Sequence, residues 1–155
     1  INFVKDYAAA GIRVPLSGSG FLTVGVLGPQ GAAAEGIETS LHYGDGLDNA
    51  KNNAFRTAFR AKAGREADVY AVQGYDAAQL LAIGLEAVKG NIDDEANLHK
   101  AMREARIDSP RGPISFSKNQ EVVQNMYLRK ATGGLNKVVG VAVEQLADPG
   151  TGCNL

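Results

Sequence analysis

The sequence predicts a mixed α/β fold, because segments with helical spacing alternate along the chain with segments that alternate residue by residue as strands do. Between residues 71 and 85 apolar side chains recur at steps of three and four, and Gly90 follows. Between residues 36 and 43 Ile37, Thr39 and Leu41 alternate with polar residues, as in a half-buried strand. With 155 residues, 45% of them apolar and 21% charged, the chain has a globular composition.

The beginning of the chain predicts a helix without a start signal. Phe3 and Tyr7 share one helical face, and Gly11 is placed to end the helix. No Ser, Thr or Asp precedes Phe3, although Asn2 could cap a shortened helix. We expect a chain cut within a helix, in which case the lack of a visible signal peptide says nothing about compartment.

Short elements follow as far as residue 46. In chain order we expect an extended run at 13–16, a loop of small residues at 17–20, a short helix at 23–27 closed by Gly28 and Pro29, the strand at 36–43, and a break at 44–46.

Three helices are expected next. Asp48 is placed to cap the first, and Gly64 to end it. The third runs from about Asp94 to Arg106, with acids in its first turn and arginines in its last. The expected buried stripes are Phe55, Ala58 and Phe59 on the first helix, Ala71, Tyr75, Ala78, Ala82 and Leu85 on the second, and Leu98, Met102 and Ala105 on the third.

The last third of the chain predicts strands. Ile114 and Phe116 alternate around Ser115, and strands at 126–130 and 137–144 are joined by the turn at 133–136 as a hairpin. The tail at 147–155 is expected to be irregular.

Charge and hydropathy exclude two classes of protein. Sixteen basic and seventeen acidic residues give a net charge of -1, which argues against a nucleic-acid surface. The longest apolar stretch, around residues 77–85, is interrupted by Gln79 and Gly84 and is far shorter than a bilayer span.

No catalytic or cofactor motif is present, so we expect no enzyme, no cofactor and no metal. Gly18-Ser19-Gly20 lacks the further glycine of a nucleophile elbow, and the spacing to Gly25 is wrong for a dinucleotide fold. His42 and His99 have no Cys or carboxylate at metal spacing, and we expect both to face solvent. Cys153 is solitary: it is an ordinary thiol in a cytosolic protein, or has a partner elsewhere in an exported one.

Three stretches together resemble the branched-chain amino-acid-type solute-binding proteins of ABC importers, the type I periplasmic binding proteins. They are residues 15–23 with 33–40, residues 53–64 with 70–78, and residues 110–116 with Tyr127-Leu128. The resemblance covers essentially the whole chain, aligned to the second half of a mature protein roughly twice as long.

The resemblance implies a two-lobed α/β fold with parallel sheets flanked by helices, incomplete in this chain. Residues 1–42 would belong to the carboxy-terminal lobe, 43–124 to the amino-terminal lobe, and 125–155 to the carboxy-terminal lobe and tail. The missing amino-terminal half would leave apolar faces exposed, so the fragment is expected to self-associate.

The resemblance also implies ligand contacts. The loop Gly18-Ser19-Gly20-Phe21 would face the cleft, and Ser19 stands where amino-acid binders carry a Glu for the ligand ammonium. Tyr70 matches an aromatic residue that lines the cleft. The alternatives are a turn residue for Ser19, a core aromatic for Tyr70 and core packing for Phe21, whereas Tyr75 is expected to be structural.

We therefore expect a periplasmic binding component that holds a small carboxylate, such as an aromatic acid, between two lobes and delivers it to a membrane permease. The alternatives are a ligand-sensing domain of a receptor or regulator on the same fold, and a binder of branched-chain amino acids.

Overall fold

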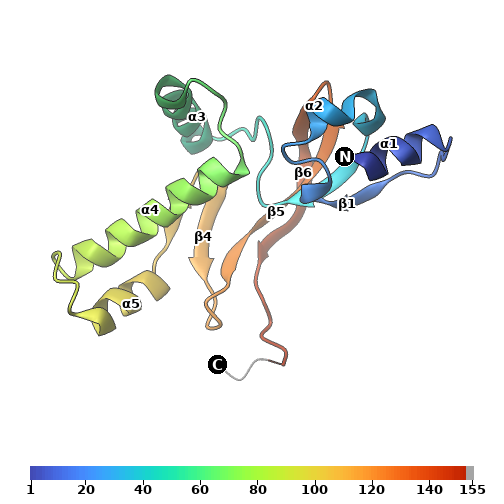
Figure 1. The fold of residues 1–155 in the computed structure, drawn as a ribbon. Coiled ribbons are helices and arrows are strands. Elements are labelled where there is room, and N and C mark those ends of the chain that lie inside the picture. The colour runs from blue at the N-terminus through green and yellow to red at the C-terminus, as the bar shows by residue number, and fades with distance from the viewer. Residues whose placement is uncertain (153–155) are drawn as a thin grey trace. The chain divides into compact units, whose positions relative to one another are not determined.

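The computed structural model describes residues 1–152, and these form two compact units (Figure 1). Unit 1 contains Ile1–Leu47 and Met126–Glu144, and unit 2 contains Asp48–Asn125 and the chain from Gln145 onward. The segments expected from the sequence, 1–42, 43–124 and 125–155, are divided differently, since the units divide the chain after Leu47, Asn125 and Glu144. The assignment of the segments to amino- and carboxy-terminal lobes stays a prediction, and Cys153 lies outside the described residues.

Unit 1 is built on a mixed sheet. β1 (Ser17–Ser19) runs parallel to β2 (Glu38–Leu41), with Ser19 opposite Ser40. β2 is antiparallel to β5 (Val122–Thr132), with Leu41 opposite Tyr127, and β5 also pairs with β6 (Leu135–Leu146). The α/β class is therefore confirmed, with one parallel pair beside antiparallel ones.

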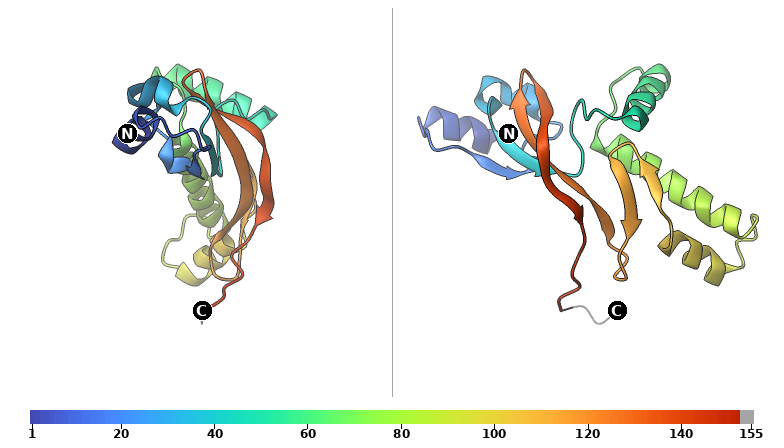
Figure 2. Two further views of the ribbon diagram at one scale, coloured as in Figure 1. Left: turned by 90° about the vertical axis from the view of Figure 1, so that its right-hand side faces the viewer. Right: turned by 180° about the vertical axis from the view of Figure 1, so that it is seen from behind.

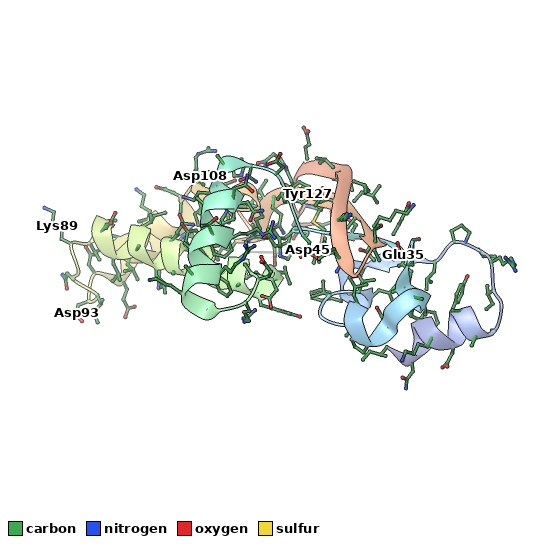
Figure 3. The ribbon with its side chains drawn as sticks, turned by 90° about the horizontal axis from the view of Figure 1, so that it is seen from above. Glu35, Asp45, Lys89, Asp93, Asp108 and Tyr127 are labelled. Carbon is green, nitrogen blue, oxygen red and sulfur yellow. The ribbon has the colours of Figure 1, made fainter. Side chains whose placement is uncertain are left out.

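The β5–β6 hairpin confirms the predicted turn, although both strands are longer than expected (Figure 2). Gly133 and Gly134 form the turn with φ angles of +59° and +77°, a conformation that L side chains rarely adopt. Glu35, which Figure 3 labels, holds the turn, because its Oε2 accepts a hydrogen bond from Gly133 N at 3.1 Å.

Four short helical segments accompany this sheet: α1 (Asn2–Ala9), η1 (Gly20–Leu22), α2 (Leu27–Gln30) and η2 (Gly31–Ala34). Val4, Ala34, Ile37 and Ala131 form the buried cluster between the helical segments and the strands. The chain after α1 turns at Gly11, where φ is +68°, as predicted.

Three local predictions in unit 1 were wrong. The small residues at 17–19 form strand β1 rather than a loop. The helix expected at 23–27 begins only at Leu27 and includes Pro29, which the first turn tolerates because its N–H has no intrahelical partner there. His42 is buried, with 8% of its surface exposed, because β2 ends at Leu41 and the strand alternation ends with it.

Unit 2 contains three helices and a hairpin: α3 (Ala50–Ala63), α4 (Val69–Ala87), α5 (Glu95–Arg103), β3 (Ile107–Ser109) and β4 (Gly112–Phe116). β3 and β4 pair antiparallel, and Phe116 of β4 pairs with Val122 at the start of β5. Gly64 ends α3 at φ +67°, as expected. Asn49, not Asp48, caps its start, since Asn49 Oδ1 accepts from Asn52 N at 2.7 Å.

α4 buries a different face from the one its spacing predicted. Val69, Val72, Asp76 and Gly84 are buried, whereas Ala78, Ala82 and Leu85 of the predicted stripe are exposed. The helix is apolar almost all round its second half, so periodicity alone could not select the buried side.

α5 packs beside α4, after the turn in which Figure 3 labels Lys89 and Asp93 (Figures 1 and 3). Ala105, Ile107 and Ile114 form the buried cluster under this pair, joined by Leu80, Ile83, Phe116 and Val122. α5 ends at Arg103, three residues before the expected end.

Candidate functional site

The predicted loop lies at the carboxyl end of strand β1. Ser19 is the last residue of β1, and Gly20 and Phe21 begin η1. β2 runs parallel to β1, so the residues that follow β2 lie at the same edge of the sheet. In open α/β sheets ligands bind outside the carboxyl ends of parallel strands.

The three predicted contact residues of this loop differ in their exposure. Ser19 and Phe21 are exposed, Phe21 to 58%, while Gly20 is buried. The exposure of Phe21 rules out the core-packing alternative within unit 1. The loop thus presents a hydroxyl and an aromatic ring to the outside, with its backbone at Gly20 facing inward.

Arg129 of β5 holds this edge of the sheet together. Its side chain is 2% exposed, and its guanidinium donates to three groups. Nη1 donates to Tyr43 O at 3.1 Å, and Nη2 donates to Gly20 O and to Thr39 Oγ1, both at 3.0 Å. One side chain therefore ties the residue after β1 to the residues of and after β2.

Two glycines make room for this arginine. A Cβ on Gly20 would lie 2.6 Å from Arg129 Nη2 and 2.6 Å from Leu41 Cβ. A Cβ on Gly44 would lie 2.8 Å from Arg129 Cδ and 2.7 Å from Val138 Cγ2. All four distances are shorter than those of real Cβ contacts, so only glycine fits at either position.

The positive charge of Arg129 has no ion-pair partner among residues 1–152. Its three acceptors are neutral, and Nε has no hydrogen-bond partner there. Burial lowers the pKa of Arg129 below its ordinary value, and the negative charge of Asp45 acts in the opposite direction. An arginine nevertheless stays charged at neutral pH.

Asp45, labelled in Figure 3, is held by the hairpin rather than by Arg129. Its Oδ2 accepts from Asn136 N at 2.8 Å, and its own N donates to Asn136 O at 2.9 Å. The Asn136 side chain also bonds Thr23 Oγ1 and donates to Thr23 O at 3.4 Å. The segment after η1 and the turn after β2 are thus both anchored to one residue.

Tyr70 belongs to unit 2 and is 58% exposed, which rules out the core-aromatic alternative within that unit. It lies in the first turn of α4, which Asp68 caps by accepting from Ala71 N at 2.9 Å. Tyr75 packs on Phe55 with ring centroids 5.0 Å apart, as expected of a structural residue.

A buried ion pair in unit 2 was not predicted from the sequence. Arg111 Nε lies 2.8 Å from Asp76 Oδ2, and both side chains are less than a tenth exposed. Ser109 Oγ donates to the same oxygen at 2.9 Å, and Arg111 also bonds Gln124. This network fixes the turn between β3 and β4 against α4.

Arg129 could have been found from one sequence signal. It alternates in phase with Tyr127 and Ala131, which are both buried, so a charged residue occupies an inward position of β5.

In the described part of the chain, no three His, Cys, Asp or Glu side chains gather as metal ligands. Nor does any helix there have the length and apolar character needed to cross a bilayer.

Polar and aromatic groups thus follow the parallel strands of unit 1, at the kind of edge where open α/β folds bind ligands. The family model described as periplasmic binding protein matches residues 1–135. The chain belongs to the periplasmic binding protein family. The comparison with curated proteins gave no match.

Solved structures of several solute-binding proteins of ABC transporters are similar to the chain. One from R. palustris, in complex with benzoate, is 48% identical with a TM-score of 0.91, over 99% of this chain and 42% of that one. One from Rhodopseudomonas palustris BisB5, in complex with 3,4-dihydroxybenzoic acid, is 31% identical with a TM-score of 0.81, over 97% and 43%. One from Desulfitobacterium hafniense, in complex with Leu, is 26% identical with a TM-score of 0.73, over 89% and 39%.

The chain thus spans about two fifths of the length of each of these structures, and the fold it forms is a partial one.

Proposed function

We propose that the natural protein containing this sequence is the solute-binding component of an ABC importer and that it binds a small aromatic carboxylate such as benzoate. The observation that carries the proposal is the 48% identity, over 99% of this chain, to a solute-binding protein in complex with benzoate. The proposal includes an extracytoplasmic, periplasmic location, delivery of the ligand to a membrane permease, and no catalysis.

The chemistry of the loop supports a carboxylate over an amino acid. Ser19 is neutral, and the charge buried nearest to Gly20 is the cation of Arg129. A ligand ammonium would meet no counter-charge on this loop, and an unpaired buried charge costs several kcal/mol. A carboxylate avoids that cost and can accept a hydrogen bond from the Ser19 hydroxyl.

We further propose that Ser19, Gly20, Phe21 and Tyr70 contact the ligand in the whole protein. Phe21 and Tyr70 are exposed in their own units, although aromatic side chains are usually at least half buried. Their flat faces are suited to an aromatic ring.

A branched-chain amino acid is the second candidate ligand. It is favoured by the 26% identical solute-binding protein in complex with Leu. For that ligand, we propose Asp45, in the turn after β2, as the carboxylate of unit 1 that would attract an ammonium group.

The test is isothermal titration calorimetry on the whole natural protein with benzoate, 4-hydroxybenzoate, leucine and valine. We expect micromolar or tighter binding of an aromatic acid and none of the aliphatic amino acids. Phe21→Ala and Tyr70→Ala should each weaken binding, with Phe3→Ala, an exposed aromatic residue of α1, as the control. Binding of leucine or valine alone would contradict the proposal.

A further inference from the structure

Arg129 lies directly beneath the predicted ligand loop. Nη2 is 3.0 Å from Gly20 O, in the middle of Ser19-Gly20-Phe21, and Nη1 is 3.1 Å from Tyr43 O after β2. The missing Cβ atoms of Gly20 and Gly44 are what allow this approach. The fold therefore places a cation within hydrogen-bond distance of both chain segments at the carboxyl ends of the parallel strands.

Arg129 has no carboxylate partner within 4.0 Å in the described chain, and its three acceptors are neutral. The buried arginine of unit 2, Arg111, is by contrast paired with Asp76 at 2.8 Å. The buried Nε of Arg129 also lacks an acceptor in the described chain. Removing an unpaired guanidinium from water is costly, and a nearby anion offsets that cost.

We infer that Arg129 determines the charge specificity of the site: its buried cation makes the ligand loop select a carboxylate over the matching neutral amide. The inference rests on the proposed function. It adds the residue that distinguishes a carboxylate from an amide, since the Ser19 hydroxyl can form a hydrogen bond with either group. Desolvation acts on the charge of Arg129, which lowers its pKa, and only Asp45 works in the opposite direction.

A substitution at Asp45 should change the ligand preference in the opposite direction to a substitution at Arg129. It is the carboxylate that acts on Arg129 electrostatically, and it contacts Asn136 N through Oδ2 at 2.8 Å. Asp45→Asn keeps the size of the side chain and one acceptor oxygen while removing the negative charge. An electrostatic role for Arg129 requires that Asp45→Asn strengthen the preference for a carboxylate.

The experiment measures the dissociation constants of benzoate and benzamide for the whole protein and three variants. Arg129→Gln should reduce the preference for benzoate over benzamide about tenfold, the order of effect that a nearby unit charge has in a partly buried site. Arg129→Lys should weaken both ligands, because an ammonium cannot donate to three fixed acceptors, but should keep the preference. Asp45→Asn should increase the preference for benzoate over benzamide.

The results distinguish a failure of the role inferred for Arg129 from a failure of the proposed function. If Arg129→Gln weakens benzoate and benzamide equally, Arg129 only supports the loop and the inference is wrong. If Arg129→Gln does not fold, an unchanged preference in Asp45→Asn overturns the inference. If the unmodified protein binds neither aromatic compound, the proposed function fails and the inference fails with it.

Discussion

Gly20 and Gly44 lie where the two parallel strands of unit 1 end, and both are required by the side chain of one residue on a third strand. Neither has a positive φ, so the constraint is close approach rather than backbone conformation. The arrangement couples the stability of unit 1 to the shape of the ligand loop. A change at either glycine should therefore affect both.

Gly20→Ala should destabilise the protein by about 1–3 kcal/mol, the usual cost of overpacking. The new methyl group would lie 2.6 Å from Leu41 Cβ, an atom too close to the backbone to swing away. Gly18→Ala, two residues earlier in β1, is the matched control, because its Cβ would meet only Leu22 Cδ2 at an ordinary 3.5 Å. Urea unfolding measures both, and equal stabilities for the two variants would refute the steric argument.

The sequence predicted the loop of this site but not the arginine beneath it. The prediction that Ser19, Gly20 and Phe21 contact a ligand rests on resemblance to a family, and such a resemblance marks local segments of chain. Arg129 acts across strand register, since it lies opposite Thr39 in β2. Which carbonyls it reaches depends on the pairing of strands about 90 residues apart, and no local pattern contains that pairing.

Among the elements, α4 shows where periodicity stops being informative. The existence of α4 and of the following helix α5 was predicted from the sequence, but the buried face of α4 was not. Gly84 lies on that face and lets α5 approach, since a Cβ there would lie 2.8 Å from Met102 Cγ. β1 and β2 are only three and four residues long, and such short strands carry little pattern. The small residues of β1 were therefore expected to form a loop, and β2 was expected to extend past His42.

Two glycines of α4 should respond in opposite directions to the same substitution. Gly84→Ala should cost about 1–3 kcal/mol by overpacking against Met102. Gly74→Ala has no atom within 4 Å of its Cβ and should stabilise the helix by roughly 0.5–1 kcal/mol. Thermal and urea unfolding of both variants checks the pair. Stabilisation by Gly84→Ala would show that α5 does not pack against this face in solution.

At the scale of the whole molecule, each unit is assembled from stretches distant in sequence, and β5 and β6 each contribute residues to both. Some apolar side chains of the mixed sheet in unit 1 are exposed to solvent. Val139, Val141 and Val143 follow one face of β6, and each is about half exposed. β6 pairs with β5, and in the described chain the one further β-bridge of β6 is that between Lys137 and Asp45 near its start. In unit 2, Leu81 and Leu85 are likewise exposed on α4.

The 155-residue chain studied by itself should therefore self-associate. An edge strand with an apolar face is a template for pairing with another copy, and a charged side chain at its centre opposes that pairing. Sedimentation velocity should show dimers or larger species that Val141→Lys reduces. Val14→Lys is the control, because Val14 is 69% exposed but lies outside the strands of the sheet. A compact monomer with a cooperative thermal transition would mean that these faces are tolerated in water, and that unit 1 is stable without anything covering β6.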